Sequence, residues 1–247
     1  MPDSPARRKP RRTPTHRPVL DALLAELEVA DTALAETVIE RRTLYRGRYM
    51  TFETDRVVRN DGLETGRDLV VHPGAVAILP LDERGRLLCV RQFRVAAGGA
   101  MLEIPAGTLD VSEDGVVEEP DVAAHRELEE ETGYRAGSME RLGGFWSAPG
   151  FSTEYLTLYL ATDLRPANES RLGPDEDERL ELARIDWHVA VDAVEAGLVE
   201  DAKSVAGILW LARLLEAQAG QYLRGAAGRA AAKTIAANLT KKPACAE

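Results

Sequence analysis

The sequence predicts an α/β/α sandwich with a mixed sheet, together with a smaller β-rich N-terminal unit. Three observations support this fold class. Segments with strand alternation and hairpin signals stand beside segments with helical spacing, which argues against an all-parallel doubly wound sheet. The run 153–162 alternates like a strand, so its leucines face one way and its tyrosines the other. A helix is expected from Pro120, a residue suited to the first helical position, to Gly133, a natural C-terminal cap.

The N-terminal elements are expected in the following order. A short amphipathic helix follows a basic tail, because leucines recur there at helical spacing: Leu20, Leu23, Leu24 and Leu27. Residues 38–58 alternate like strands with a break at Gly47, and a turn is expected at Asn60 to Gly62. Three β-rich runs then follow, at 67–72, 75–80 and 86–93.

The C-terminal part predicts one strand and two helices. Residues 180–187 read as a strand after an acidic loop at 174–179. The second helix carries an apolar face made of Val205, Ile208, Leu209 and Ala212. The chain is thus divided into a disordered basic, Pro-rich tail at 1–18, a helix and β unit at 19–66, the main domain at 67–216 and an Ala-rich C-terminal helix or tail at 217–247.

The composition, with 45% hydrophobic and 29% charged residues, is ordinary for a soluble globular protein, and no apolar run is long enough to span a membrane. The net charge of −10 argues against nucleic acid as the main partner, since phosphate contacts need clustered Lys and Arg. The basic tail could form a nucleic-acid arm, but a solvated tail is the more common reading. The start lacks the apolar segment of a secretory signal, and Cys89 and Cys245 are expected as free thiols, so we expect the cytoplasm.

The segment 113–134 holds nine acidic residues and one arginine. Glu127, Glu130 and Glu131 stand at positions i, i+3 and i+4, so they share one face of the expected helix. Like charges at this spacing destabilise a helix unless something neutralises them, and hard divalent cations prefer carboxylate oxygens. From the charge pattern alone, a cation-binding helix and an acidic surface helix that binds no ligand are equally good interpretations.

The spacing of these residues resembles the Nudix box, G-x5-E-x7-R-E-U-x-E-E-x-G-U, in which U is a bulky apolar residue. Every position from Glu118 to Tyr134 fits this pattern, including Arg126 and Gly133. The opening glycine matches Gly107, with ten residues between it and Glu118 rather than five. We interpret this difference as a five-residue insertion in the loop before the helix, which surface loops accept at small cost.

The resemblance implies a pyrophosphohydrolase that uses a divalent cation, magnesium or alternatively manganese. The metal ligands of the family match Glu127, Glu130 and Glu131, and a further ligand matches the backbone carbonyl of Ala106. Arg126 is expected to hold the carboxylates in place by a bidentate pair. The resemblance therefore places Arg126 and Glu130 among the catalytic residues as well.

Other segments are similar to the ADP-ribose pyrophosphatase subfamily: HPGAVAILPLD (72–82), VRQFR (90–94), LEIPAGTLD (102–110), SAPGFSTEYLTLYLA (147–161) and GLVEDAKSVAGILWL (197–211). The similarity implies that Arg67 and Arg94 hold the diphosphate or the ribose, a role that suits the guanidinium fork. It also implies that Glu103 is a site glutamate. Pro149 occupies the place of a proline that this subfamily carries beyond the box.

The resemblance leaves alternatives open for two roles. The subfamily often stacks an aromatic residue on adenine across a dimer, and at this place Arg48 precedes Tyr49, so either side chain could make the contact. The general base of the subfamily comes from a mobile loop, which matches 173–179 here. Glu176 fits the base position, and Glu178 could instead bind metal or orient the water.

The resemblance implies hydrolysis of the diphosphate of ADP-ribose to AMP and ribose 5-phosphate by a homodimer. The main alternative is a broader enzyme for nucleoside diphosphate sugars such as GDP-mannose, because these subfamilies share the fold and the box. A sensor that binds ADP-ribose without cutting it would have a degraded box, whereas the box here is intact. An RNA-processing relative would need a basic groove, which the net charge of −10 disfavours.

Overall fold

The structure is a computed structural model that describes residues 17–167 and 179–224. Contacts group the chain into two compact units. The first unit comprises Met1–Gly47 and Thr51–Val70, and the second comprises Arg48–Met50 and Val71–Glu247. No helix in the described ranges is both long enough and apolar enough to cross a membrane.

The first unit combines one helix with a three-stranded sheet. Helix α1 (Arg17–Ala33) is the helix expected after the basic tail, and its leucine side chains at 23, 24 and 27 are exposed. Strands β1 (Glu36–Arg46), β2 (Thr51–Arg59) and β3 (Glu64–Val71) form a sheet in the order β1-β2-β3. The strands expected on either side of Gly47 are therefore confirmed.

The second unit contains a mixed sheet of four strands. These are β4 (Ala75–Pro80), β7 (Ala106–Thr108), β8 (Tyr134–Trp146) and β9 (Tyr155–Pro166), in the order β7-β4-β9-β8. Strand β4 runs parallel to β9, whereas the β4–β7 and β8–β9 pairs are antiparallel. The prediction of a mixed sheet, rather than an all-parallel one, is confirmed.

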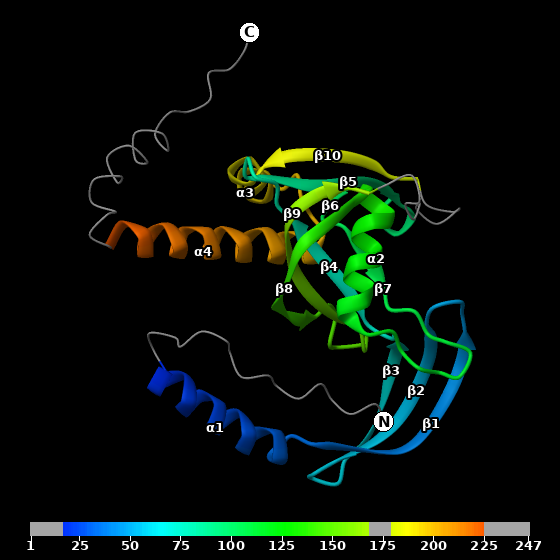
Figure 1. The fold of residues 1–247 in the computed structure, drawn as a ribbon. Coiled ribbons are helices and arrows are strands. Elements are labelled where there is room, and N and C mark those ends of the chain that lie inside the picture. Colours follow the sequence, from blue (N-terminus) through cyan, green and yellow to red (C-terminus); the bar gives the residue numbers. More distant parts are fainter. Residues whose placement is uncertain (1–16, 168–178, 225–247) are drawn as a thin grey trace. The chain divides into compact units, whose positions relative to one another are not determined.

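A second, antiparallel sheet and three helices complete this unit (Figure 1). The sheet has the order β10-β5-β6, with β5 at Arg86–Arg94, β6 at Gly99–Glu103 and β10 at Glu181–Asp186. A short 3-10 turn, η1 (Val95–Ala97), connects β5 to β6. The helices are α2 (Pro120–Thr132), α3 (Trp187–Glu195) and α4 (Ala202–Arg224).

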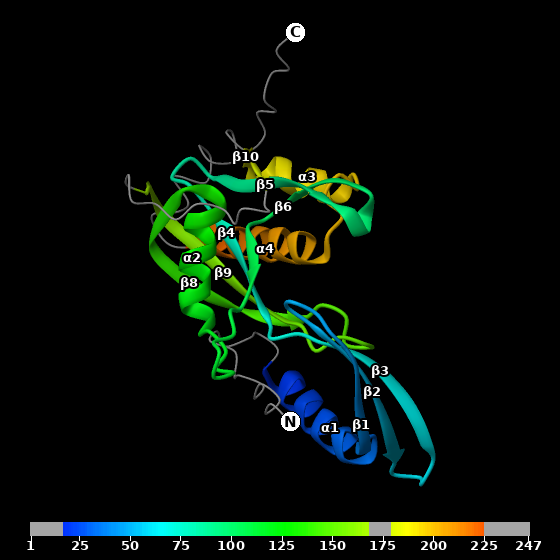
Figure 2. The same cartoon turned by 90° about the vertical axis from the view of Figure 1, so that its right-hand side faces the viewer.

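Helices cover both faces of the mixed sheet, as Figures 1 and 2 show. The alternation of β9 explains this arrangement, because Leu156 and Leu158 belong to the core on the α4 side. Tyr159 and Ala161 belong to the core on the α2 side, together with Leu128 of α2. Both cores are formed by fully or nearly fully buried apolar side chains, which makes the α/β/α sandwich the stable arrangement.

Three strands and one residue differ from the sequence-based expectation. Strands β6, β7 and β8 were not expected, since each segment contains at least one glycine, a residue that is rare in strands. In α4, Leu209 is exposed, so its place on the buried face was wrong. Leu211 is fully buried instead, beside Ile208 and Ala212.

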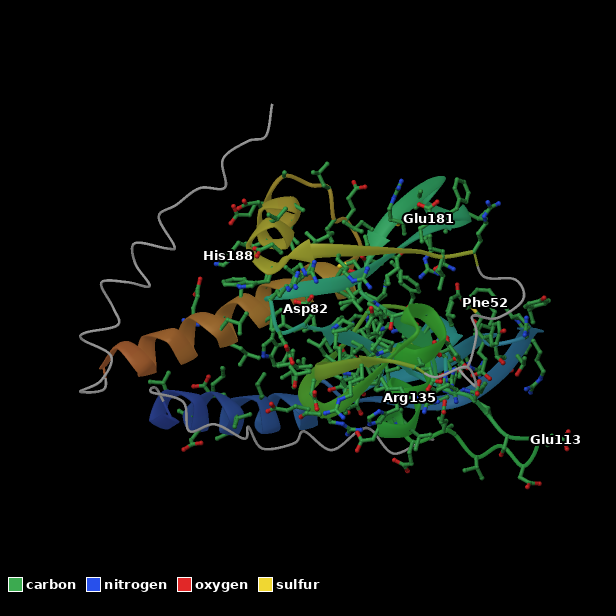
Figure 3. The ribbon with its side chains drawn as sticks, turned by 45° about the horizontal axis from the view of Figure 1, so that its top comes forward. Phe52, Asp82, Glu113, Arg135, Glu181 and His188 are labelled. Carbon is green, nitrogen blue, oxygen red and sulfur yellow. The ribbon has the colours of Figure 1, made fainter. Side chains whose placement is uncertain are left out.

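Helix α2 begins and ends where the sequence predicts. Pro120 is its first residue, and Gly133 caps its C-terminus with a positive φ of 71° and a hydrogen bond from its N–H to the carbonyl of Glu129. The loop before it contains a small hairpin, in which Val111 and Val117 form an antiparallel bridge. Figure 3 shows Glu113 at the outer end of this loop, away from α2. The inserted residues are therefore accommodated at the surface.

Candidate active site

The acidic face of α2 is organised by a single guanidinium group. Arg126 donates from Nη1 to Glu127 Oε1 at 2.7 Å and to Glu130 Oε2 at 2.9 Å. It also donates from Nη2 to Glu118 Oε2 at 2.8 Å. These hydrogen bonds, with Glu118 first, raise the pKa of Arg126 above its ordinary value even though partial burial opposes the shift. Arg126 thus stays charged and holds three carboxylates in fixed positions, as the sequence predicts for this residue.

Glu118 lies in the site despite the insertion that precedes it. Besides its bonds to Arg126, it accepts a hydrogen bond from the backbone N–H of Asp110 at 3.2 Å. Burial raises the pKa of Glu118, but the bonds from Arg126 and Asp110 outweigh burial and leave the pKa below its ordinary value. The loop therefore closes in such a way that Glu118 still reaches the arginine of the box.

The loop before α2 approaches its acidic face closely at Gly107. A Cβ atom at this glycine would lie 1.8 Å from Glu127 Oε1, so only glycine fits beside this carboxylate as it stands. One residue earlier, the N–H of Ala106 donates to Glu131 Oε2 at 3.1 Å. Strand β7 thus brings Ala106 and Gly107 directly against the glutamates of α2.

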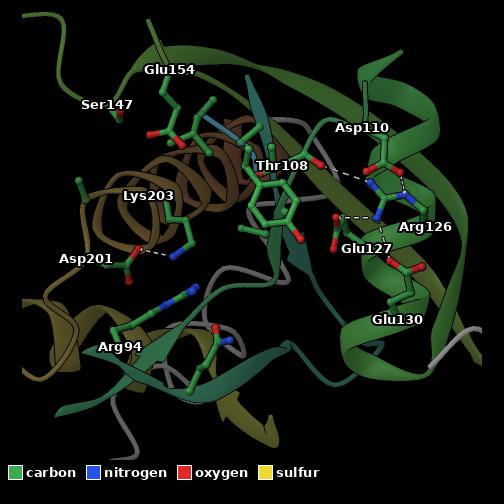
Figure 4. A pocket seen from close by; sticks show the side chains of 17 residues that line it. Arg94, Thr108, Asp110, Arg126, Glu127, Glu130, Ser147, Glu154, Asp201 and Lys203 are labelled. Carbon is green, nitrogen blue, oxygen red and sulfur yellow. Dashed lines mark hydrogen bonds and ion pairs between the residues drawn. The ribbon is translucent and has the colours of Figure 1, made fainter. Parts of the chain in front are cut away.

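A cavity of about 550 Å³ lies beside Gly107 and Glu127 (Figure 4). Arg126, Glu127 and Glu130 lie on one side of it, and Arg94, Asp201 and Lys203 lie on the opposite side. Ala106, Gly107, Thr108, Asp110, Ser147 and Glu154 also line it. The cavity is therefore lined by residues of α2 on the side of the box and by residues near β5 and α4 on the opposite side.

Opposite the box, four charged side chains form a connected network. Arg94 donates to both carboxylate oxygens of Glu103, at 2.8 and 2.9 Å, and Glu103 also accepts from Lys203 Nζ. Lys203 in turn donates to Asp201 Oδ1 at 2.9 Å. Burial raises the pKa of Glu103, but Arg94 and Lys203 together outweigh it and hold the pKa below its ordinary value. Glu103 is only 2% exposed, so it remains charged only because two cations contact it.

A third part of the cavity wall contains Glu154. His72 directly follows β3, and its Nε2 atom lies 3.8 Å from Glu154 Oε1. Burial lowers the pKa of His72, and the nearby carboxylate of Glu154 only partly offsets that effect. Thr153 bonds to both backbone polar groups of His72, which fixes the loop that carries Glu154.

The remaining residues of the predicted site differ in what they contact. Tyr49 lines the cavity, and the Arg48 guanidinium lies 4.6 Å from the centre of its ring. Arg67 donates from Nε to Glu36 Oε2 at 3.0 Å within the first unit. Pro149 lies in an exposed turn between β8 and β9. Glu176 and Glu178, the candidates for the base, lie outside the described residues.

The donor atoms at the acidic face suit a hard divalent cation. Glu127, Glu130 and Glu131 offer only oxygen atoms, the ligand type that Mg²⁺ and Mn²⁺ prefer. Within the described ranges, no three potential ligands are already arranged around one point. Glu127 and Glu130 accept hydrogen bonds from Arg126, whereas Glu131 accepts one from the Ala106 N–H. Arg126 contacts three carboxylates here once Glu118 is included, and a backbone N–H contacts Glu131, so the site gathers the carboxylate oxygens that a hard cation prefers.

Comparison with known proteins agrees with this geometry. The family model of the NUDIX domain matches residues 71–206. The chain belongs to the Nudix family. A relative named ADP-ribose pyrophosphatase, from Bacillus subtilis (strain 168), is 36% identical over 179 residues, which cover 72% of this chain and 94% of that protein. The family model spans the box and most of the residues that line the cavity, from Ala75 to Lys203.

Two further similarities bear on the family and its fold. A GDP-mannose pyrophosphatase from Cronobacter sakazakii (strain ATCC BAA-894) is 35% identical over 140 residues, or 53% of this chain and 69% of that protein. A crystal structure of an ADP compounds hydrolase superposes with a TM-score of 0.63 at 24% identity, covering 74% of this chain and 95% of the other. The Nudix fold of this chain is therefore shared with a solved hydrolase, and Nudix hydrolases generally use divalent metal ions.

Four charged residues of the cavity were not recognised in the sequence. Asp201 and Lys203 lie within the segment GLVEDAKSVAGILWL, Glu154 lies within SAPGFSTEYLTLYLA, and Asp110 ends LEIPAGTLD. All three segments are similar to the subfamily, so the resemblance gives a signal for the segments but not for these side chains. Only the structure shows that Lys203 contacts Glu103, a residue one hundred positions earlier.

Proposed function

We propose that this chain hydrolyses ADP-ribose to AMP and ribose 5-phosphate with a bound divalent cation. Magnesium is the first choice for the cation and manganese the second. The observation that carries the proposal is the carboxylate face of α2, which Arg126 organises at the edge of a cavity of about 550 Å³. The name and the 36% identity of the Bacillus subtilis relative support ADP-ribose as the substrate.

In this reaction a water oxygen forms a bond to one phosphorus atom, and the bond from that phosphorus to the bridging oxygen breaks. The bridging oxygen leaves with the other phosphate, and a base takes a proton from the water. Glu127, Glu130, Glu131 and the Ala106 carbonyl would hold the cation. When bound, the cation polarises a phosphoryl oxygen and lowers the pKa of its water. Arg126 keeps the carboxylates in position throughout.

The other roles follow from the resemblance to the subfamily. Glu176 serves as the base, with Glu178 as the alternative. Arg94 and Glu103 contact the substrate opposite the box, and their bidentate pair keeps the guanidinium oriented. Tyr49 or Arg48 stacks on adenine.

Two residues of the proposed site, Arg67 and Pro149, do not line the cavity. Arg67, in the N-terminal unit, binds the substrate in a homodimer, and Pro149 shapes the turn beside the cavity. A homodimer is supported by strand β1 of that unit, since most of its side chains are exposed in the single chain. A small sheet of this kind rarely buries enough apolar area to be stable alone. We further propose that the protein acts in the cytoplasm on this small-molecule substrate, without a membrane or nucleic acid.

A broader activity on nucleoside diphosphate sugars is the second candidate. The similarity to a GDP-mannose pyrophosphatase supports it, because a related chain with that name shares 35% of its residues over the matched region. A sensor that binds ADP-ribose without hydrolysis is the weaker alternative, since the carboxylates and arginine of the box are all present.

A substrate panel tests the proposed function. The full-length protein is incubated with magnesium and, separately, with ADP-ribose, GDP-mannose, ADP-glucose, NADH and a dinucleoside polyphosphate, and the products are measured by chromatography. We expect the highest kcat/KM for ADP-ribose, with AMP and ribose 5-phosphate as products, and no activity in excess EDTA. A higher kcat/KM for GDP-mannose would establish the second candidate. Binding of ADP-ribose without any turnover would establish the sensor.

A further inference from the structure

The side of the cavity opposite the box has a charge balance of its own. Arg94, Asp201 and Lys203 line this side, and the buried Glu103 contacts two of them. These four residues, here called the neutral wall, comprise two cations and two carboxylates. They come from three different elements: the end of β5, the end of β6 and the start of α4. The N–H of Ser204 donates to Asp201 Oδ1 at 3.0 Å, and the buried Ser204 hydroxyl accepts from Ile104 N–H at 2.8 Å. The wall is therefore built into the fold rather than formed by loose surface side chains.

Lys203 has a donor left for a ligand. Its side chain is only 14% exposed, and it lines the cavity. An ammonium group has three N–H donors, and the described part of the chain accepts from it at Glu103 and Asp201. A third donor is thus available to an oxygen atom that enters the cavity.

The charge balance of the wall favours a sugar hydroxyl over a phosphate as the group that binds Lys203. A phosphate approaching Lys203 would also approach two carboxylates, so the wall offers no surplus positive charge to an anion. A sugar hydroxyl is different, because it can accept a hydrogen bond from the ammonium and donate one to a carboxylate. The neutral wall therefore suits a neutral, hydroxyl-rich group better than a diphosphate.

We propose that Lys203 is a specificity-determining residue, which donates a hydrogen bond to a hydroxyl of the sugar that lies beyond the diphosphate. This inference rests on the proposed function and deepens it by assigning the sugar half of the substrate to the neutral wall. Figure 4 shows Lys203 and Arg94 across the cavity from Glu127 and Glu130. A diphosphate at the acidic face would accordingly direct its sugar toward Lys203.

The test measures binding of two matched probes to Lys203→Met in the presence of magnesium. One probe is the α,β-methylene analogue of ADP-ribose, in which a CH2 group replaces the bridging oxygen and prevents cleavage at that position. The other is α,β-methylene-ADP, which has the same nucleotide and phosphonate but no second sugar. We expect Lys203→Met to weaken the first probe by roughly tenfold or more, the scale of one hydrogen bond to a charged group. The Kd of the second probe should change less than about twofold.

Two further variants separate substrate contact from structural damage. Lys203→Gln retains N–H donors toward Glu103 and Asp201 without the charge, and should weaken only the probe that carries the sugar. Arg213→Met removes an exposed cation from the same helix and should leave both Kd values unchanged. Thermal unfolding of each variant shows whether the fold is retained.

Several outcomes would overturn the inference. Equal weakening of both probes would show that Lys203 acts on the nucleotide half or only on the fold. An unchanged Kd for the sugar-bearing probe would show that Lys203 makes no contact with the sugar. If the wild-type protein had the same Kd for both probes, this cavity would not contact the second sugar. The proposed function fails separately, if the wild-type protein with magnesium does not hydrolyse ADP-ribose in the substrate panel.

Discussion

Replacing Gly107 with alanine would displace a carboxylate of the box without removing it. The new Cβ would lie 1.8 Å from Glu127 Oε1 and 1.9 Å from its Cδ, whereas real Cβ contacts are essentially never closer than 3.0 Å. The difference, 3.0 minus 1.8, requires a movement of at least about 1.2 Å. The clashing atoms are the end of a flexible side chain, so Glu127 can move aside and the backbone can stay in place.

The movement should affect catalysis far more than folding. It breaks the 2.7 Å bond from Arg126 to Glu127 and takes a proposed metal ligand out of position. A misplacement of about 1 Å at a reacting centre can cost roughly 10²-fold in rate. We therefore expect Gly107→Ala to lower kcat by about 10²-fold. The free energy of unfolding should fall by no more than about 1–3 kcal/mol, the range for an overpacked site.

Steady-state kinetics on ADP-ribose and thermal unfolding measure the two effects. Gly99→Ala is the matched control, because no atom lies within 4 Å of a Cβ there and its φ is not positive. A wild-type kcat for Gly107→Ala would refute the reasoning, since the position of Glu127 beside the loop would then be unimportant. An unfolded variant would instead show that the loop cannot adjust.

Four further predictions concern the metal, the base, acid stability and assembly. Glu127→Gln and Glu131→Gln should each reduce kcat severely while the fold is retained, as circular dichroism and kinetics would show; wild-type turnover, or full activity in EDTA, would contradict the metal assignment. Glu176→Gln should lower kcat by about 10²-fold or more with little change in KM, the scale of a general base; if both this variant and Glu178→Gln keep the wild-type kcat, the base lies elsewhere. The pKa of Glu103 is lowered in the folded state, so its contribution to stability is complete above the ordinary pKa of 4.5 and is lost as the pH falls through the lowered value. Glu103→Gln should therefore make the free energy of unfolding fall less steeply in acid, as urea titrations at several pH values would measure. An equally steep fall in this variant would contradict the prediction. Light scattering should give the mass of a homodimer, and a fully active monomer would count against it.

Much of the fold and one half of the site could be predicted from local sequence. Helix α2 has Pro120 and Gly133 at its ends, and both act through backbone conformation alone. The glutamates of the box share a face because a helix has fixed periodicity, so their proximity needs no tertiary information. The alternation in β9 likewise fixes which residues face each core.

The other half of the site depends on contacts that no local pattern encodes. Lys203 and Glu103 meet because α4 packs over the end of β6, and their separation in sequence gives no periodicity to detect. Strand β8 was not expected because Gly143 and Gly144 weaken its strand propensity. These glycines have a tertiary reason, since a Cβ at Gly143 would lie 2.7 Å from the Trp210 ring and one at Gly144 would lie 2.5 Å from the Leu156 carbonyl oxygen.

The two sides of the cavity differ in the charged groups that line them. On the box side Arg126 contacts Glu118, Glu127 and Glu130, whereas on the neutral wall two cations face two carboxylates. A carboxylate that faces a phosphate at 4 Å opposes it by about 4 kcal/mol near a protein surface. Under the proposed function, a divalent cation held by the box carboxylates would offset this repulsion. The same cation would then favour binding of the diphosphate at the box side as well as its cleavage there.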